Sequence, residues 1–175
     1  MIIATLTDSD LPALQAHVAR HRAESGVGDN LHFMPFVPGD EEGPQGIDTK
    51  ALKLSLQQPG WQRWFLAKPD ADTVVGQVDL KGDKLKTGLH RCELGIGIEQ
   101  GWRGQGLGEK LMLAAIEFAR LESSISWIDL RVFAHNAPAR ALYERLGFEI
   151  VGTLEDRFRI DGESVGDVIM CLRLD

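Results

Sequence analysis

A glycine-rich segment just past the middle of the chain has residue types that point directly to chemistry. It spans residues 100–109, reads Gln-Gly-Trp-Arg-Gly-Gln-Gly-Leu-Gly-Glu, and joins a strand-like segment to a helix-like one. Glycines let a ligand approach the backbone closely, and a helix start offers free N–H groups at the positive end of its dipole. The segment therefore predicts an anion site suited to a pyrophosphate. Its expected binding residues are Arg103 as a charged donor, Gly104, Gln105, Gly106, Leu107 and Gly108.

The order of residues in this segment argues against two common phosphate sites. A P-loop requires Gly-Lys-Ser/Thr, which is absent from the segment. A dinucleotide-binding turn requires G-x-G-x-x-G early in its domain, whereas these glycines follow G-x-G-x-G in the second half of the chain. The alternative without a ligand is a tight turn between a strand and a helix.

A second segment, residues 130–148, reads LRVFAHNAPARALYERLGF. Asn136 and Tyr143 are seven residues apart, which is about two helical turns, so one helix face can carry both. Tyr143 is the only tyrosine in the sequence. These two residues are therefore the candidate polar groups of this segment.

Together the two segments resemble the GNAT superfamily of N-acetyltransferases. Arg103, Gly106 and Gly108 match its Arg-x-x-Gly-x-Gly signature, and the second segment is similar to its later motif, in which an Asn precedes Ala-Leu-Tyr and Leu-Gly-Phe. The resemblance covers roughly residues 73–173, whereas residues 7–60 match only in the order of elements.

The resemblance implies an α/β (α+β) fold with a central mixed, mostly antiparallel sheet of about seven strands and helices on both faces. It also implies acetyl-CoA as co-substrate and no metal. In this family the fourth and fifth strands splay apart, and the pantetheine arm of acetyl-CoA pairs with the backbone of the fourth. Here these strands are expected at Glu93–Ile98 and Trp127–Phe133.

The implied reaction is direct attack of a neutral amine on the thioester. A backbone N–H near Ile96 or Ile98 is expected to hold the oxyanion. Tyr143 resembles the family's general acid, and a phenol with a pKa near 10 can protonate a thiolate with a pKa near 8.5. Asn136 is expected either to bind the pantetheine arm or to cap its helix.

The general base is left open by the sequence. Some family members place a glutamate on the fifth strand, five residues before the Asn, where this chain has Arg131. Glu93 is the next candidate, acting directly or through water, and pairing with a neighbouring cation is its alternative role. Asp129 is a more remote candidate, and His90 and His135 are more typical of surface or capping histidines.

The predicted acceptor is the primary amine of a small molecule, cationic or amino-acid-like. The alternatives are a protein N-terminus or lysine, and an acyl-CoA-binding sensor without turnover. Acidic residues that can attract a cation gather in the segments expected around the acceptor; these are Asp29, Asp40, Glu41, Glu42, Glu155, Asp156, Asp161, Glu163 and Asp167. The expected apolar walls are Phe33, Phe36, Trp61 and Trp64.

The elements that must position these groups follow from periodicity and turn signals. Strands are expected at 2–6, 63–68, 73–80, 90–98, 127–133, 148–154 and 164–173, with a turn at Asp161-Gly162. Helices are expected from about 11 to 24 with an apolar stripe of Leu11, Leu14 and Val18, from Asp48 to about Gln58, and at 106–121 and 137–146. Residues 35–47 have the composition of a loop.

Length, net charge and composition limit the classes of partner that this chain can have. The chain has 175 residues and a formal net charge of −7, which favours one domain over residues 1–175 and argues against nucleic acid. No apolar run is long enough for a membrane span, and the N-terminus lacks the pattern of a signal peptide, so we expect a cytoplasmic protein. The two cysteines are expected to be reduced and buried, and a homodimer is expected by analogy with the family.

Overall fold

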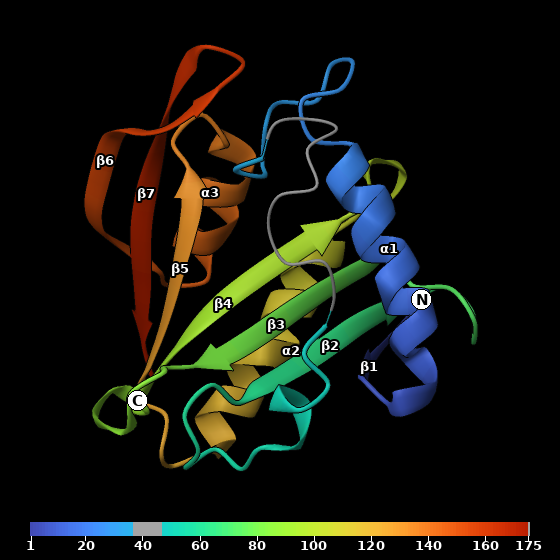
Figure 1. The fold of residues 1–175 in the computed structure, drawn as a ribbon, viewed down its shortest axis with the longest axis vertical. Helices are drawn as coiled ribbons and strands as arrows, with labels where there is room; N and C mark the ends of the chain where they lie inside the picture. The colour runs from blue at the N-terminus through green and yellow to red at the C-terminus, as the bar shows by residue number, and fades with distance from the viewer. Residues whose placement is uncertain (37–46, 175) are drawn as a thin grey trace.

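The structure is a computed structural model that describes residues 1–36 and 47–174. Within these residues, seven strands form one sheet in the order β1-β2-β3-β4-β5-β7-β6 (Figure 1). The strands are β1 (Ile2–Thr5), β2 (Gln62–Lys68), β3 (Gly76–Gly82), β4 (Arg91–Ile98), β5 (Trp127–Phe133), β6 (Glu149–Ile160) and β7 (Glu163–Arg173). The helices are α1 (Leu11–Ala23), α2 (Leu107–Leu121) and α3 (Ala137–Arg145), with short 3₁₀ turns at Asp8–Asp10, Ala51–Lys53, Lys86–Gly88 and Gln100–Trp102.

The sheet is mixed. Among the described strands, β4 and β5 pair in parallel and every other neighbouring pair is antiparallel. The parallel pair needs a crossover, and α2 supplies it. This confirms the predicted mixed, mostly antiparallel sheet.

Helices cover both faces of the sheet, as predicted: α1 crosses one face and α2 lies against the other (Figure 1). The buried face of α2 repeats at helical spacing and includes Leu107, Leu111, Met112, Ala115, Ile116 and Ala119. The buried residues of α1 are Leu14, His17 and His21. The predicted stripe on α1 is therefore confirmed at Leu14 and at Val18, which is partly buried against the same cluster, but two histidines share the buried face.

Trp61 and Trp64 are core residues, so their predicted role as walls of an acceptor site is wrong. Trp61 is 0% exposed and packs over Gly82, where a methyl group would lie 2.2 Å from the indole Nε1. Trp64 belongs to a smaller buried cluster beneath α1 with Leu14 and Leu66. Both side chains gain more from burial in these clusters than from exposure at a ligand site.

The predicted helix over residues 48–58 is also wrong, because a single 3₁₀ turn at Ala51–Lys53 replaces it. Asp48 does cap this turn, accepting a hydrogen bond from the N–H of Ala51 at 3.2 Å. The backbone then becomes extended at Leu54 (ψ 143°), whose carbonyl accepts a hydrogen bond from Arg63 Nη2 at 2.9 Å. This side chain on β2 takes a carbonyl that a continuing helix would need.

The final hairpin is longer than predicted. β6 continues to Ile160, and the chain reverses at Asp161 (φ 51°) and Gly162 (φ 82°), the predicted turn. Cys92 and Cys171 are free and buried, as predicted. The expected loop at 35–47 lies almost entirely outside the described residues.

The packing of Trp61 over Gly82 yields a stability prediction. Gly82→Ala should lower the free energy of unfolding by about 1–3 kcal/mol, because the new methyl group overlaps an indole that has no free space. Gly152→Ala on β6 is the matched control, since a methyl group there meets nothing within 4 Å. Urea denaturation of both variants measures the difference. Equal midpoints would contradict the packing described above.

Candidate active site

The pairing of β4 with β5 covers only part of either strand. Residues 91–94 pair with residues 127–130, from Arg91↔Trp127 to Leu94↔Leu130. Beyond Leu94, β4 keeps its pairing with β3 as far as Ile98, and the two parallel strands diverge (Figure 1). Residues 95–98 therefore have one backbone edge without a strand partner, the splayed arrangement that the resemblance to the family implies.

The glycine-rich segment lies at the end of this open stretch of β4. Gly104 (φ 72°) and Gly106 (φ 74°) adopt the left-handed conformation that glycine tolerates without strain. Within the described residues, the backbone N–H groups of 104–106 donate no hydrogen bond. The first N–H groups of α2 follow, which have no acceptor inside their own helix. The turn therefore presents a row of free donors at a helix N-terminus, which suits an anion.

Gly108 serves a different purpose from the two glycines before it. A methyl group there would lie 3.1 Å from Leu142 of α3 and 3.4 Å from Ile98 of β4. The glycine lets the first turn of α2 approach both elements closely. The free N–H groups of the turn, the open edge of β4 and helix α3 consequently lie next to one another.

Arg103 uses its guanidinium group inside the protein. Its Nε donates to the carbonyl of Ile98 (2.8 Å), and its Nη atoms donate to Asn30 (3.0 Å) and Glu24 (2.7 Å). The guanidinium carbon also lies 5.0 Å from the ring centroid of Phe33. Arg103 thus braces the turn against the segment that follows α1. Its predicted part in binding a pyrophosphate stays a prediction.

Asn136 and Tyr143 occupy the start and the buried face of α3. Oδ1 of Asn136 accepts a hydrogen bond from the N–H of Ala139 at 3.3 Å, so the capping role is present. Tyr143 is buried and its ring packs 6.1 Å from that of Phe148. Burial raises the pKa of Tyr143 to about 12, so its hydroxyl keeps its proton at neutral pH and remains available to donate it.

The charged residues on β5 are paired. Arg91 Nε donates to Asp129 at 2.7 Å, and Arg131 Nε donates to Asp167 at 2.6 Å. Asp129, a remote candidate for the base, is therefore occupied by an arginine. Glu93 lies on the exposed surface of the part of β4 that still pairs with β5, opposite Asp129. Its role as base stays a prediction.

A polar cluster beneath α1 escapes the sequence analysis. Nδ1 of His17 lies 2.7 Å from Oε1 of Glu99, and its Nε2 contacts Oε1 of Gln77. Burial alone would raise the pKa of Glu99, but hydrogen bonds from Arg20 and His17 outweigh it and hold that pKa below its usual value. The cluster ties α1 to β3 and to the end of β4. The two histidines, four residues apart on one helix face, were the only local signal.

His21 continues this cluster toward β4. Its ring is stacked between those of His17 and Phe33, with centroids 5.8 and 4.6 Å away. A methyl group on Gly97 would lie 2.6 Å from the ring, so this glycine makes room for it. Burial, together with His17 and Arg103, lowers the pKa of His21 to about 3. The imidazole is therefore neutral, and its Nδ1 has no hydrogen-bond partner among the described residues.

Asp79 of β3 lies on the same face, one step further from the end of β4. It is 4% exposed, and Oδ1 would lie 2.9 Å from a methyl group on Gly95. Burial raises the pKa of Asp79, against the effect of Lys81, whose Nζ lies 3.1 Å from Oδ2 without the alignment of a hydrogen bond. A lone acid in the apolar segment 73–80 was the available sequence signal.

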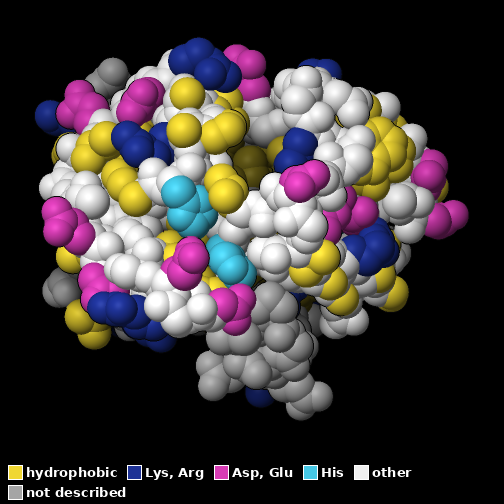
Figure 2. Space-filling model, turned by 90° about the horizontal axis from the view of Figure 1, so that it is seen from above, with side chains coloured by type: hydrophobic (Ala, Val, Ile, Leu, Met, Phe, Trp, Pro, Cys, Tyr) yellow, Lys and Arg dark blue, Asp and Glu magenta, His cyan; other side chains and the backbone are white. Residues whose placement is uncertain are grey.

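The segment after α1 joins the two sides of the sheet above the diverging strands. Oγ of Ser25 accepts hydrogen bonds from the N–H groups of Phe33 and Met34 (3.0 and 3.1 Å). The carbonyl of His32 accepts a hydrogen bond from Nε2 of His135 at 2.6 Å. Nε2 of the His32 ring lies 3.6 Å from Oδ2 of Asp161. Figure 2 views this end of the molecule and shows a hollow bordered by hydrophobic, acidic and histidine side chains.

The predicted acidic surface is only partly available to a cation. Asp156 is paired with Arg159, and Asp167 with Arg131. Asp40, Glu41 and Glu42 lie outside the described residues. The ring of Phe33 stacks on that of His21 with centroids 4.6 Å apart, and its role as an apolar wall of the acceptor site stays a prediction.

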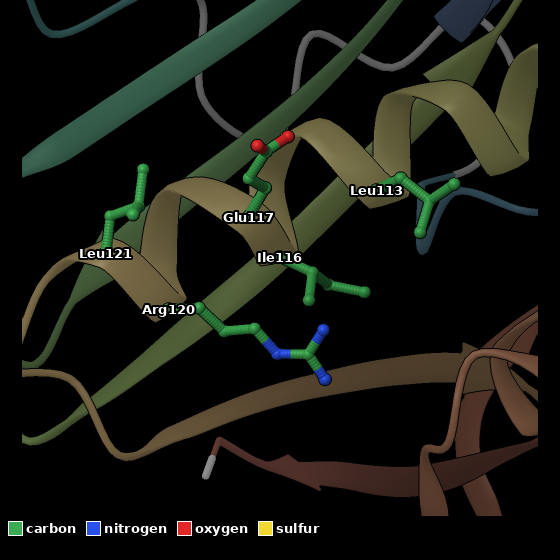
Figure 3. A pocket seen from close by; sticks show the side chains of 5 residues that line it. All are labelled: Leu113, Ile116, Glu117, Arg120 and Leu121. Atoms are coloured by element: carbon green, nitrogen blue, oxygen red, sulfur yellow. The ribbon is translucent and has the colours of Figure 1, made fainter.

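Two of the recesses on the surface of the described residues lie along α2 and beside the glycine turn. The larger, about 360 Å³, runs along the outer side of α2 between Leu113 and Leu121 and does not touch the glycine turn (Figure 3). The smaller, about 190 Å³, is lined by Trp102, Gln105 and Lys110 beside the turn. The described residues contain no group of three or more His, Cys, Asp or Glu side chains able to hold a metal ion. No helix among them is long and apolar enough to cross a bilayer.

The sequence is similar to a known protein family and to characterised relatives. A profile of the acetyltransferase (GNAT) family matches residues 31–148. The [ribosomal protein uS5]-alanine N-acetyltransferase of Escherichia coli is 29% identical over 150 residues, which are 82% of this chain and 77% of that protein. The L-amino acid N-acetyltransferase of Escherichia coli is 33% identical over 136 residues, 77% of this chain and 83% of that protein.

Solved structures show the same fold. An acetyltransferase from Salmonella typhimurium, solved with its cofactor acetyl-CoA, matches with a TM-score of 0.79 at 17% identity, over 100% of this chain and 94% of that one. The ribosomal-protein-alanine N-acetyltransferase of Brucella melitensis matches with a TM-score of 0.76 at 22% identity, over 99% and 100% of the two chains.

The neutral state of His21 predicts a specific acid sensitivity. The unfolded chain takes up a proton at this residue near pH 6.5, whereas the folded protein does so only near pH 3. Stability should therefore fall as pH drops below 6.5, by about 1.4 kcal/mol per pH unit from this residue alone. Urea denaturation from pH 7.5 to 5 should show a flatter curve for His21→Gln than for the wild type.

The control is His90→Gln, at an exposed histidine, which should keep the wild-type slope. Parallel curves for the wild type and His21→Gln would mean that His21 is charged in the folded protein.

Proposed function

The chain is a member of the GNAT family of acetyltransferases, and from this premise we propose that it transfers an acetyl group from acetyl-CoA to the α-amine of a small amino-acid-like molecule. The observation that carries the proposal is the end of β4–β5 pairing at Leu94 and Leu130. It leaves a strand edge free beside a turn with free N–H groups. An extended acyl-pantetheine chain can pair with the first while its pyrophosphate binds the second.

In this proposal each group has one task. The N–H groups of residues 104–108 bind the pyrophosphate, and the edge of β4 from Gly95 to Ile98 binds the pantetheine arm. A backbone N–H near Ile96 or Ile98 stabilises the oxyanion as the amine attacks the thioester carbonyl. The C–S bond then breaks, and Tyr143 donates its proton to the departing thiolate.

The choice of an α-amine is supported by two relatives. One is named for L-amino acids and the other for an alanine of a ribosomal protein, so an α-amino group is common to both acceptors. In this proposal the segment from Ser25 to Met34, which is held to the β5–α3 connection and to the β6–β7 turn, limits the size of the acceptor that reaches the open edge of β4. Such a limit favours a small molecule.

A protein N-terminus is the second candidate. The relative that acts on ribosomal protein uS5 aligns with 82% of this chain, and an extended N-terminal residue is as slender as a free amino acid. Both candidates use the same machinery, and they differ only in the group attached to the α-carbon of the acceptor, a carboxylate or a peptide chain.

A panel of amines tests the proposed function directly. Thiol release from acetyl-CoA should be stimulated by L-amino acids and by L-alaninamide. Peptides with an N-terminal alanine test the second candidate, and peptides with an internal lysine, polyamines and aminoglycosides serve as comparisons. Stimulation only by side-chain amines or polyamines would overturn the α-amine proposal.

Tyr143→Phe tests the proposed general acid. The variant keeps the ring that packs against Phe148, so folding and acetyl-CoA binding should be unchanged. Its kcat should fall by about 10²-fold or more, because the thiolate must leave without a proton donor. Stopped-flow thiol release and calorimetric titration with acetyl-CoA measure the two quantities separately. A wild-type kcat would remove Tyr143 from the mechanism.

A further inference from the structure

The described residues include three buried carboxylates, and Asp79 differs from the other two. Asp10 accepts hydrogen bonds from Thr7 and Lys68, and Asp167 accepts one from Arg131. Oδ2 of Asp79 has no hydrogen-bond partner, although Asp79 is 4% exposed. Lys81, the nearest cation, is half-exposed and poorly aligned with it. A buried carboxyl group without a directed partner is costly to keep and calls for a functional explanation.

The position of Asp79 supplies that explanation. It is the cross-strand neighbour of Gly95, the first residue of β4 beyond the last pair with β5. Because Gly95 has no side chain, the carboxyl group lies directly over this backbone, and a methyl group there would lie 2.9 Å from Oδ1. The carboxyl group therefore stands on the α1 face of β4 where the strands begin to diverge.

A second polar group occupies the same face. The Cδ2 and Nε2 atoms of the His21 ring stand over Gly97 as Asp79 stands over Gly95, while Nδ1, which has no hydrogen bond among the described residues, lies 3.8 Å from Oε2 of Glu24. Two glycines, at alternate positions of one strand, thus leave room for one buried polar group each. The buried Oδ2 of Asp79, which has no hydrogen-bond partner and lies on the same face as a neutral imidazole, is the observation that points to a ligand with N–H donors, of which an ammonium group is the simplest.

We propose that Asp79 is the group that holds the acceptor ammonium and takes its proton, with the neutral ring of His21 as an additional hydrogen-bond acceptor. This inference rests on the proposed acetyl transfer. It replaces neither Tyr143 nor the glycine turn, and it assigns the base that the sequence leaves open to β3 instead of β4 or β5.

Protons and bonds balance in the proposed step. The acceptor arrives as R–NH₃⁺, and its charge drives the proton that Asp79 holds in the free protein to solvent. The ammonium group then gives one of its own protons to Oδ2 of the ionised Asp79, which returns this residue to its starting state. The lone pair of the neutral nitrogen then forms the C–N bond, and the C–S bond breaks. The second proton leaves the nitrogen and replaces the one that Tyr143 gives to sulfur. The products are R–NH–acetyl, CoA thiol and one proton.

The surroundings of Asp79 suit this task. The charged groups that act on it are Lys81 on its own strand and Glu93 on β4, while burial is the largest influence and raises its pKa above its usual value. From α1, His21 and His17 lie further along the same face, and on β2 its neighbour is Trp64, which does not titrate. A carboxylate with a raised pKa is a stronger base than a solvated one.

The experiment compares Asp79→Asn with the wild type, using L-alaninamide as acceptor. kcat/KM should fall by about 10²–10⁴-fold, and the acid limb of its pH profile should be lost, leaving only the titration of the free amine. Glu93→Gln tests the competing carboxylate, and Asp72→Asn, in the exposed β2–β3 turn, is the matched control. If Asp79→Asn keeps more than about a tenth of the wild-type kcat/KM, or if the limb is lost in Glu93→Gln instead, the assignment to Asp79 is wrong.

Calorimetry separates this inference from the proposed function. L-Alaninamide is titrated into the CoA-bound protein in two buffers of different ionisation enthalpy, so no turnover is needed. The wild type should bind it and release a proton from Asp79, whereas Asp79→Asn should show no buffer-dependent heat. If the wild type releases this proton but transfers no acetyl group, the proposed function fails and Asp79 remains the ammonium site. If the wild type shows no binding, or if both proteins behave alike, the inference about Asp79 fails.

Folding of the variant is checked by urea denaturation. Burial raises the pKa of Asp79, so the folded protein keeps a proton there at pH values where the unfolded chain has lost it. The wild type therefore loses stability relative to Asp79→Asn as the pH rises from the usual pKa of an aspartate through the raised one. The variant should therefore be no less stable than the wild type at neutral pH. A strongly destabilised Asp79→Asn would show that the carboxylate is needed for the fold and would overturn the proposal.

Discussion

The limited pairing of β4 with β5 is the constraint on which the rest of this structure depends. A parallel pair fixes both strands at the end where their ladder forms, and here that end is closed by the Arg91–Asp129 ion pair. The guanidinium carbon of Arg91 also lies 4.7 Å from the centroid of the Trp127 ring. Beyond Leu94 the right-handed twist of the sheet can carry the strands apart, because no further hydrogen bond joins them. One edge of β4 is therefore exposed in the interior of the sheet, between strands that pair on either side.

The unpaired stretch of β4, residues 95–98, needs contacts from neighbouring elements to hold it in place, since an unpaired strand edge tends to pair with another chain. On one side, Gly108 lets α2 meet α3 through Leu142. On the other side, Arg103 links the end of β4 to Glu24 and Asn30. The segment that contains Asn30 is joined through His32 to the residues after β5 and to the β6–β7 turn. The supports on the side of Arg103 and His32 use polar groups, whose directed hydrogen bonds fix distances more sharply than apolar packing does.

The two faces of β4 have different characters as a result. Ile96 and Ile98 pack against the apolar core on the side of α2, so that face contributes stability. Gly95 and Gly97 alternate with them and leave room for Asp79 and His21 on the side of α1. Burial on this face shifts the pKa of the acid upward and that of the imidazole downward. Both groups are thereby held closer to their uncharged forms.

The sequence by itself determined the features that are encoded within one segment. The glycine turn, the strand at 127–133, the Asn136 cap and the reversal at Asp161-Gly162 follow from local spacing and backbone preference, and the family follows from two such segments. Tertiary structure decided the rest. The helix expected after Asp48 gave way to hydrogen bonds from Arg63, and Trp61 went into the core. His17 meets Gln77 and Glu99 across 60 and 82 residues of chain, and Asp79 meets Gly95 across a strand pair. Such contacts have no local period, because they depend on which strands become neighbours and on which glycine leaves space between them.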